Sequence, residues 1–410
     1  MRRLILYAVL ILAACSCGQN GQNSQSGQKA GAAPELLRAV PSDALAVGVF
    51  SHCDKGLQAF VDQAVDLILL DYGKQARNKA AIALCDVGTL TPLLVLETGR
   101  AEADTTAAVA DLLAQADSLK LSTAIVSLDK HNALLLSPSA TVIKVALRHL
   151  ASETSILDAP YFASIEENGQ DFIAYRNRGA GKLFSFGLQG VDPKKLTAFI
   201  RDAAEWTVVT GNRLRLVQPQ TGKYFGNFLD SIEEAPSSFA RICPAGAETI
   251  VAFPVASLKD RRNAYENWLD ARVELEAYKD RIQALKKKAG KSPLVWEKEQ
   301  DVREVVYIAT KDYSINLVRT AKSAKSDGVQ KNPYAGFVRA LYGEPFAAAD
   351  SCCIRKGNWI ISGERSVLDT LKLGAEKPES WPSKARAVVQ NQDGRLTSIN
   401  DNITIWHSNL

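Results

Sequence analysis

Apolar and polar positions along the chain predict short strands mixed with amphipathic helices. Runs of aliphatic and β-branched residues alternate with stretches whose apolar residues recur every three or four positions, the period of a helix. These patterns predict strands at 44–50, 92–97, 122–128 and 132–137, and helices at 55–71, 74–85 and 104–117. The letters DKHN between the last two strands predict the turn of a hairpin.

Further hairpins are predicted in four places, each with two β-rich arms. They cover 205–218, which turns at Gly211-Asn212; 304–318; 351–363, which turns at Gly357-Asn358; and 386–399, which turns at Asp393-Gly394. Hairpins imply antiparallel pairing. Helices interspersed among them imply an α+β fold rather than a doubly wound parallel sheet.

Two pairs of segments resemble each other in the same order along the chain. VPSDALAVGVF (40–50) matches CPAGAETIVAF (243–253) at a shift of 203 residues. ALLLSPSATVIKVAL (133–147) matches NWIISGERSVLDTLK (358–372) at a shift of 225 residues. Each pair predicts a buried strand that feeds a helix, and the difference of 22 between the shifts indicates an insertion in the second half.

The repeated order predicts an internal duplication. The second match places Ser137 on Ser362. The predicted halves are residues 34–240 and 241–410, with the boundary in the Pro- and Ser-containing stretch 236–245. Two unrelated α+β domains that share common strand–helix units are the alternative.

One helix of the second half is predicted to be long. From 257 to 289, apolar residues recur at three- and four-residue steps, and charged residues fill the other faces. Such a helix would be about 50 Å long, more than a small domain covers, so it either folds back near Ala264 or projects. A projecting end would offer Tyr278, Ile282 and Leu285 to a partner. Packing of the helix on its own sheet is the alternative.

The charge balance argues against a nucleic-acid-binding protein. The 410 residues include 49 basic and 45 acidic side chains, and a nucleic-acid-binding protein would show a clustered basic excess. After residue 14, no stretch approaches 18 consecutive apolar residues, so we expect no transmembrane helix there.

The N-terminus has the layout of a secretory signal peptide. Arg2 and Arg3 precede an apolar run at 4–14, which is interrupted only by Tyr7 and is too short to span a bilayer. The letters LAAC at 12–15 follow the order aliphatic, small, small, cysteine. This stretch resembles the lipobox of bacterial lipoproteins.

That resemblance implies a lipid anchor. Residues 1–14 would be removed, and Cys15 would carry acyl chains and become the first residue; Cys17 lacks the aliphatic position before it. The resemblance also implies the outer membrane, facing the periplasm. Ser16 is not the aspartate of inner-membrane retention, and 17–31 has no acidic cluster of the kind that marks surface export. An ordinary cleaved signal peptide is the alternative.

A tether follows the lipobox. Residues 15–33 are rich in Gln, Asn, Ser and Gly and can bury almost nothing, so we expect a flexible tether. The body after it opens with Pro-x-Asp-Ala at 41–44, ahead of a strand. A chain of two such halves also resembles uncharacterised lipoproteins of Bacteroides-type bacteria, which implies no established activity.

Five cysteines lie in the body of the chain: Cys53, Cys85, Cys243, Cys352 and Cys353. An odd number leaves at least one thiol free, and their spacing contains no CxxC pair and no zinc pattern. The periplasm permits disulfides, so the connectivity stays open. Buried reduced cysteines that pack as small apolar side chains are the favoured interpretation.

No catalytic motif is present in the sequence. NRGAGKL (177–183) contains Gly-x-Gly-Lys but lacks the earlier glycine and the following Ser or Thr of a P-loop, so it predicts a turn. GxSxG and HExxH are missing. We predict no catalytic residues, no metal site and no cofactor. The four histidines are scattered: His52, His131, His149 and His407.

The tryptophans are expected to pack in the core or between domains, and a sugar-stacking surface is the alternative. They are Trp206, Trp268, Trp296, Trp359, Trp381 and Trp406. The pattern as a whole favours a membrane-anchored binding or scaffold protein of the cell envelope, with a protein or glycan partner and no nucleic acid. The alternatives are an assembly or folding factor for envelope proteins, and a hydrolase whose site is assembled from distant residues.

Overall fold

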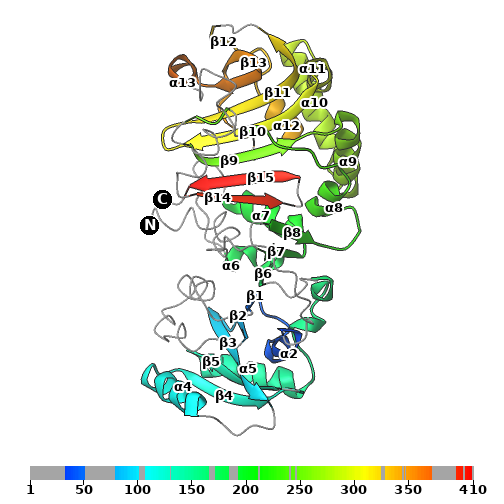
Figure 1. Cartoon of the computed structure of the whole chain (residues 1–410). Helices are drawn as coiled ribbons and strands as arrows, with labels where there is room; N and C mark the ends of the chain where they lie inside the picture. Colours follow the sequence, from blue (N-terminus) through cyan, green and yellow to red (C-terminus); the bar gives the residue numbers. More distant parts are fainter. Residues whose placement is uncertain are drawn as a thin grey trace, which may run out of the picture. The chain divides into compact units, whose positions relative to one another are not determined.

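The protein is an α+β protein with antiparallel sheets (Figure 1). The computed structural model describes residues 33–50, 79–100, 107–129, 131–165, 171–183, 193–210, 213–239, 242–244, 247–324, 328–343, 346, 348–371, 394–399 and 402–408. The chain divides into two compact units, Met1–Pro219 and Gln220–Leu410, which are described separately. Residues 220–240, expected in the first half, therefore lie in the second unit.

The first unit is built on an antiparallel sheet with the strand order β8-β7-β6-β1-β2-β3-β5-β4. Its strands are β1 (Ala46–Phe50), β2 (Ala80–Asp86), β3 (Leu90–Arg100), β4 (Ser122–Ser127), β5 (His131–Ser137), β6 (Phe172–Arg176), β7 (Trp206–Thr210) and β8 (Arg213–Val217). Its helices are α2 (Ala33–Leu36), α4 (Ala107–Ser118), α5 (Ala140–Ala151), α6 (Ala180–Leu183) and α7 (Pro193–Ala203).

Most sequence-predicted elements of this unit are confirmed, and one is wrong. The hairpin around DKHN is β4–β5, and the hairpin predicted over 205–218 is β7–β8. The helix predicted over 74–85 is wrong, because its described part belongs to β2, which pairs with β1 and β3. The helix predicted over 55–71 lies outside the described residues.

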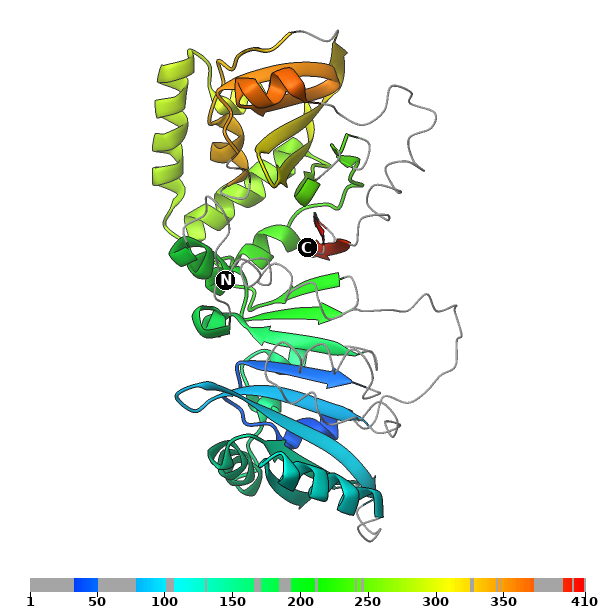
Figure 2. The ribbon, with the colours of Figure 1, turned by 90° about the vertical axis from the view of Figure 1, so that its left-hand side faces the viewer.

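Both faces of this sheet are apolar. Alternate residues of a strand point to opposite faces, so Val47 and Val49 join one cluster and Phe50 joins the other. Helix α5 covers the first face through Val142 and its neighbours, whereas α4 contributes Ala116 to the second (Figure 2). The first unit is thus a sheet with helices on both faces.

The second unit has the strand order β12-β13-β11-β10-β9-β15-β14. Its strands are β9 (Ala247–Pro254), β10 (Val302–Thr310), β11 (Ser314–Ala324), β12 (Gln330–Lys331), β13 (Cys352–Gly363), β14 (Gly394–Ile399) and β15 (Ile403–Ser408). Its helices are α8 (Phe225–Asp230), α9 (Leu258–Ala271), α10 (Leu275–Ala289), α11 (Pro293–Gln300), α12 (Phe337–Tyr342) and α13 (Arg365–Thr370).

One hairpin predicted in this unit is wrong, and part of a second lies outside the described residues. Residues 352–363 form the single strand β13, in which Gly357 has a φ of +60° at an irregularity in the pairing with β11. A glycine at positive φ suits a β-bulge as well as it suits a turn. In the tail, the predicted first arm at 386–393 lies outside the described residues. Gly394, predicted at the turn, begins β14, which pairs with β15.

The predicted long helix is also wrong as a single helix. Helix α9 ends at Ala271 and α10 begins at Leu275. Between them Val273 adopts a left-handed φ of +62°, and the Glu274 amide donates to the Leu269 carbonyl at 2.8 Å. The two helices fold against each other, with the rings of Tyr265 and Tyr278 5.6 Å apart. None of the described helices is long and apolar enough to cross a bilayer.

Five strands of each unit share one order: β1-β2-β3-β5-β4 in the first and β9-β10-β11-β13-β12 in the second. Val47 pairs with Ala83, and Ile250, which is Val47 shifted by 203, pairs with Ile308, which is Ala83 shifted by 225. The 22 additional residues of the second unit therefore lie between its first two strands, where α9, α10 and α11 are found.

The pairing register also corrects the sequence match of Ser137 with Ser362. Leu94 of β3 and Asn316 of β11 are equivalent, because they pair with Ile82 and Tyr307, which are related by the same shift of 225. Leu94 pairs with Leu136 and Asn316 pairs with Ser362, so Leu136 is the position equivalent to Ser362. With this shift of 226, buried Leu135 corresponds to buried Ile361. The sequence match was one residue out, which would have turned the strand over.

Candidate functional site

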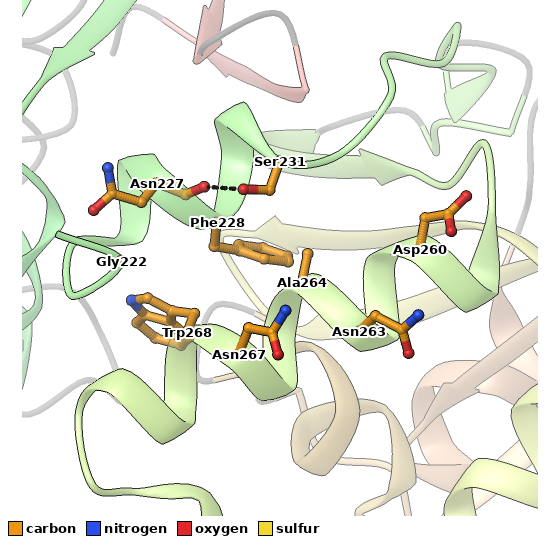
Figure 3. A pocket seen from close by; sticks show the side chains of 9 residues that line it. All are labelled: Gly222, Asn227, Phe228, Ser231, Asp260, Asn263, Ala264, Asn267 and Trp268. Carbon is orange, nitrogen blue, oxygen red and sulfur yellow. Dashed lines mark hydrogen bonds between the residues drawn. The ribbon is translucent and has the colours of Figure 1, made fainter. Parts of the chain in front are cut away.

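The candidate site is a surface hollow of about 340 Å³ in the second unit, between helices α8 and α9 (Figure 3). Its lining combines carboxamide, carboxylate and hydroxyl groups with two aromatic rings. The lining residues are Gly222, Asn227, Phe228, Ser231, Asp260, Asn263, Ala264, Asn267 and Trp268. Five of these nine residues are polar, and Phe228 and Trp268 supply the apolar surface.

Helix α9 presents its polar lining residues from one side. Ser257 caps the helix by accepting a hydrogen bond from the Asp260 amide at 3.3 Å. Asp260, Asn263 and Asn267 then follow at steps of three and four residues, which places them on one helix face. Ala264 lies between them, and its small side chain leaves room for the ring of Phe228, which enters the floor of the hollow from α8.

The two asparagines of α9 are exposed and available to a ligand. Among the described residues, no hydrogen bond joins the carboxamide of Asn263 or Asn267 to another group of the protein. Asn227 differs, because its Oδ1 accepts from the Tyr224 amide at 3.3 Å and its Nδ2 donates to Gln220 at 3.4 Å. Asn227 therefore holds the start of α8, and the α9 asparagines supply the free polar groups.

An aromatic cluster makes the floor of the hollow rigid. Trp268 Nε1 donates to the Lys223 carbonyl at 3.1 Å, and the Arg272 guanidinium lies 5.3 Å from the centre of the indole ring. The rings of Phe225 and Phe228 lie 5.5 and 6.2 Å from Trp268. Such packing holds the indole in one orientation, so a ligand would meet a preformed surface.

A network of buried charged and polar side chains anchors helix α9. Arg261 Nη2 donates to Glu297 Oε1 at 2.7 Å, and Tyr342 Oη donates to the same oxygen at 2.7 Å. Arg262 Nη2 reaches Glu297 Oε2 at 3.0 Å. Glu297 is fully buried, and burial, together with that carboxylate, raises the pKa of Tyr342 well above its usual value of 10. This network ties α9 to α11 and α12, so the hollow lies on an anchored helix.

A second buried carboxylate anchors the segment that leads out of α8. Glu304 of β10 accepts hydrogen bonds from the hydroxyls of Ser237 and Ser238, from the Ser238 amide at 2.9 Å and from Arg319 Nε at 3.1 Å. Residues 237–238 fall in the stretch expected as a boundary between halves. In the structure they are bonded to the sheet of the second unit.

The residues predicted to meet a partner are located elsewhere in this unit. Tyr278 and Ile282 are buried, with 2% and 5% of their surface exposed. Leu285 lies against Gly336 at the start of α12, where an added Cβ would be 3.4 Å from its Cδ2. We therefore do not propose these three side chains as a partner surface. Cys15 lies outside the described residues.

The described thiols are buried and unreactive in character. Cys85, Cys243, Cys352 and Cys353 are free and buried, and Cys53 lies outside the described residues. Burial raises the pKa of both Cys85 and Cys243 to about 12. A thiol with that pKa stays protonated at neutral pH, and the thiol is a poor nucleophile compared with the thiolate.

The histidines and the glycine-rich stretch have structural contacts. His131 lies between two carboxylates, with Nδ1 2.9 Å from Glu35 and Nε2 3.3 Å from Glu97. The described side chains of the protein form no group of three or more potential metal ligands. Residues 177–183 form a helical turn and α6, not the turn between strands predicted from the sequence.

Four of the tryptophans have described surroundings, three of them in the core and one at the hollow; Trp381 lies outside the described residues. Trp206, Trp296 and Trp359 are buried, as expected from the sequence. Trp268 lines the hollow instead. The spacing of Asp260, Asn263 and Asn267 was visible in the sequence, but polar residues at helical steps usually mark a solvated face. Only the packing of α8 beside α9 makes this face part of a hollow.

Comparison with known proteins adds no relative. No family model, curated protein or solved structure matches this chain.

Proposed function

We propose that this chain is a membrane-anchored binding protein of the cell envelope and that the hollow between α8 and α9 binds its ligand. The observation that carries this proposal is the pair of free carboxamides, Asn263 and Asn267, beside the fixed ring of Trp268. Free polar groups next to a rigid aromatic surface can orient a ligand at little entropic cost.

A glycan is the ligand class that fits these groups. Each carboxamide offers two donors and an acceptor, and Asp260 adds carboxylate acceptors. Sugar hydroxyls both donate and accept, while the C–H faces of a sugar ring match the apolar surface of Trp268 and Phe228. The guanidinium nearest the indole, Arg272, is already held by Glu274 at 2.9 Å. An uncharged, hydroxyl-rich ligand therefore suits the site better than an anion.

The proposed anchor is lipid on Cys15. The lipobox-like letters LAAC at 12–15 and the short apolar run before them support this proposal. One acyl chain binds a membrane weakly and two or more bind it stably. Residues 15–33 would tether the folded units to the periplasmic face of the outer membrane, within reach of envelope glycans. Replacing Cys15 with Ala should abolish acyl labelling, and replacing Cys17 with Ser should leave it intact.

We also propose that the two units arose by internal duplication. The shared five-strand order and the matching pairing registers support this origin. Val142 of α5 and Leu368 of α13 occupy equivalent positions and lie in the apolar cluster of the same sheet face. The units differ outside this framework, because α4 precedes the edge strand β4 whereas α12 follows the edge strand β12. An experimental structure with a different strand order in either unit would contradict the duplication.

Binding to glycans tests the function. The full-length protein in detergent should co-sediment with purified peptidoglycan sacculi or bind soluble envelope oligosaccharides in calorimetry. We expect the double variant Asn263→Ala, Asn267→Ala to lose at least about tenfold in affinity, since each lost hydrogen bond is worth roughly 0.5–1.5 kcal/mol.

The matched control is Gln283→Ala, which removes an exposed carboxamide from α10, outside the hollow. This variant should bind as the wild type does. Equal binding by all three proteins would show that the hollow is not the site. No binding by the wild-type protein to any glycan tested would overturn the glycan proposal.

A further inference from the structure

Strand β4 forms one edge of the sheet in the first unit. It pairs with β5, and the strand order of the unit ends with it. Its sequence, Ser122 to Ser127, contains no charged residue and no proline. Natural edge strands are usually protected by charge, by proline or by being short, because an open edge can pair with another strand. The edge strand of the second unit is protected in this way: β12 has two residues, one of them Lys331.

The direction of the main-chain groups of β4 follows from one hydrogen bond. The Leu128 amide donates to the His131 carbonyl at 2.8 Å, so residues 128 and 131 form a hydrogen-bonded pair of the β4–β5 hairpin. Such pairs alternate along antiparallel strands. Residues 122, 124 and 126 therefore bond to β5, and Thr123, Ile125 and Ser127 direct their N–H and C=O groups toward the open edge.

The same three residues have exposed side chains, and one of them is large and apolar. Ile125 has 48% of its surface exposed, whereas the side chains of Val126 and Leu128 are buried in the core. Thr123 and Ser127 are exposed on either side of Ile125. The edge thus offers an apolar side chain between two hydroxyls, next to three unused pairs of main-chain groups.

We infer that β4 pairs antiparallel with β4 of a second copy of this chain, around a two-fold axis at Ile125. The outward residues are symmetric about this position, so each Thr123 faces the second copy's Ser127, and each Ile125 faces the second copy's Ile125. Each of these three pairs exchanges two main-chain hydrogen bonds, about six in all. An interface of this kind is isologous, as in most homodimers.

A second copy fits this edge because the strand is complementary to itself. Opposed hydroxyl side chains form favourable cross-strand pairs, and opposed β-branched side chains pack well. No like charges meet, since β4 carries none. The contact would also cover Ile125, the most exposed large apolar residue among the described strands of the first unit.

Cysteine cross-linking tests the register. Cα atoms in a hydrogen-bonded antiparallel pair are about 5.5 Å apart, within the range of about 4.4–6.8 Å that a disulfide requires. The full-length Ile125→Cys variant in detergent, under mild oxidation, should give a reducible dimer of twice the mass of its own reduced monomer. The matched control is Leu147→Cys on α5, because Leu147 is also an exposed apolar residue, at 37%; it should stay monomeric.

Sedimentation of uncross-linked protein gives a second readout. The wild-type chain should sediment as a dimer and Ile125→Lys as a monomer, with an unchanged circular dichroism spectrum and unchanged glycan binding. Three results would overturn the inference: a monomeric wild-type protein, equal cross-linking of the two cysteine variants, or a disulfide adduct of Ile125→Cys with a different protein. The last result would identify β4 as an edge that accepts an extended segment of another chain.

Discussion

The two units place different side chains at one equivalent pair of strand positions. In the first unit Leu94 pairs with Leu136, and both are buried in an apolar cluster with Ala116 of α4. In the second unit the equivalent pair is Asn316 and Ser362, which are also buried, at 1% and 5% exposure. The same strand framework therefore carries an apolar pair in one unit and a polar pair in the other.

The reason lies in what covers this face of each sheet. Helix α4 satisfies its own main-chain groups internally and meets the sheet with apolar side chains. The second unit covers the equivalent face in part with the short helix α12 and with Phe346. There Asn316 Nδ2 donates to the Phe346 carbonyl at 2.9 Å, and Arg261 Nη1 donates to the Leu341 carbonyl at 3.1 Å.

The comparison teaches that buried polar side chains in the second unit satisfy main-chain carbonyls at the end of α12 and just after it. A buried carbonyl without a partner costs about 1–3 kcal/mol. Asn316 and Arg261 remove that cost, but Arg261 then needs a buried counter-charge, which Glu297 supplies. In the first unit, buried Asn177 likewise donates through Nδ2 to the Ile200 carbonyl of α7 at 2.9 Å.

The largest expected effect comes from removing the counter-charge. Glu297→Ala leaves Arg261 buried without its partner and should lower the free energy of unfolding of the second unit by about 3–5 kcal/mol. The control is Glu299→Ala, which removes the exposed partner of Lys291 and should cost at most about 1 kcal/mol. Urea unfolding followed by tryptophan fluorescence, with a separate transition for each unit, measures both. Equal losses would show that the buried network does not carry the stability.

Exchanging the polar and apolar pairs tests the comparison directly. Leu94→Asn places a carboxamide in the apolar cluster under α4 and should cost the first unit about 2–5 kcal/mol. Asn316→Leu leaves the Phe346 carbonyl without its donor and should cost the second unit about 1–3 kcal/mol. If Asn316→Leu stabilised the second unit, the hydrogen bond to Phe346 would not explain the polar pair. Thermal unfolding monitored by circular dichroism gives both values.

Cys85 lies in the apolar cluster on the sheet face that α5 covers, and its burial predicts a pH dependence of stability. Its folded pKa of about 12 lies above the usual value of 9, so this thiol stabilises the fold below pH 9. The contribution is lost as the pH rises from 9 towards 12, at about 1 kcal/mol per pH unit. Urea unfolding at pH 8, 9 and 10 should therefore show a shallower decline for Cys85→Ala than for the wild type. Parallel declines would contradict the assignment.

The smallest expected effect concerns the break between α9 and α10 in the second unit. Val273 holds a φ of +62° with 93% of its surface exposed, an unfavourable conformation for a β-branched residue. Val273→Gly relieves that strain but gives the unfolded chain more freedom, so we expect a net gain of up to about 1 kcal/mol. Asp270→Gly, in the last turn of α9, should instead destabilise by at most roughly 0.5–1 kcal/mol. A loss of stability in Val273→Gly would show that the turn is not strained.

Local patterns predicted the elements whose pairing is local. The β4–β5 hairpin followed from alternating side chains around DKHN, and α5 followed from the apolar spacing after Ser137. The antiparallel α+β class also followed from the sequence. In the hairpin and the helix, the residues that bond to one another lie close together in the sequence, so the local pattern of side chains is enough to predict the element.

The candidate site was only partly visible. The spacing of Asp260, Asn263 and Asn267 on one helix face could be read from the sequence, since α9 is a helix from its own periodicity. The hollow could not, because Phe228 and Trp268 form its floor through contacts between helices separated in the chain. The burial of Tyr278 against Tyr265 was missed for the same reason, since it depends on the reversal at Val273.

Turn chemistry and side-chain periodicity thus specified the local elements of this protein, and long-range packing specified the rest. Strand β2 is rich in Ala and Leu, which favour a helix, yet it is a strand because β1 and β3 bond to both its edges. Gly357 could have made a turn, but β11 continues alongside β13 and makes it a bulge. A glutamate usually lies at the surface, but Glu297 is buried. Its carboxylate accepts hydrogen bonds from Arg261, Arg262 and Tyr342, which lie on other elements. A residue's own neighbours in the chain set its preferred backbone, but its partners across the sheet and between helices set its burial, and burial carries the larger free energy.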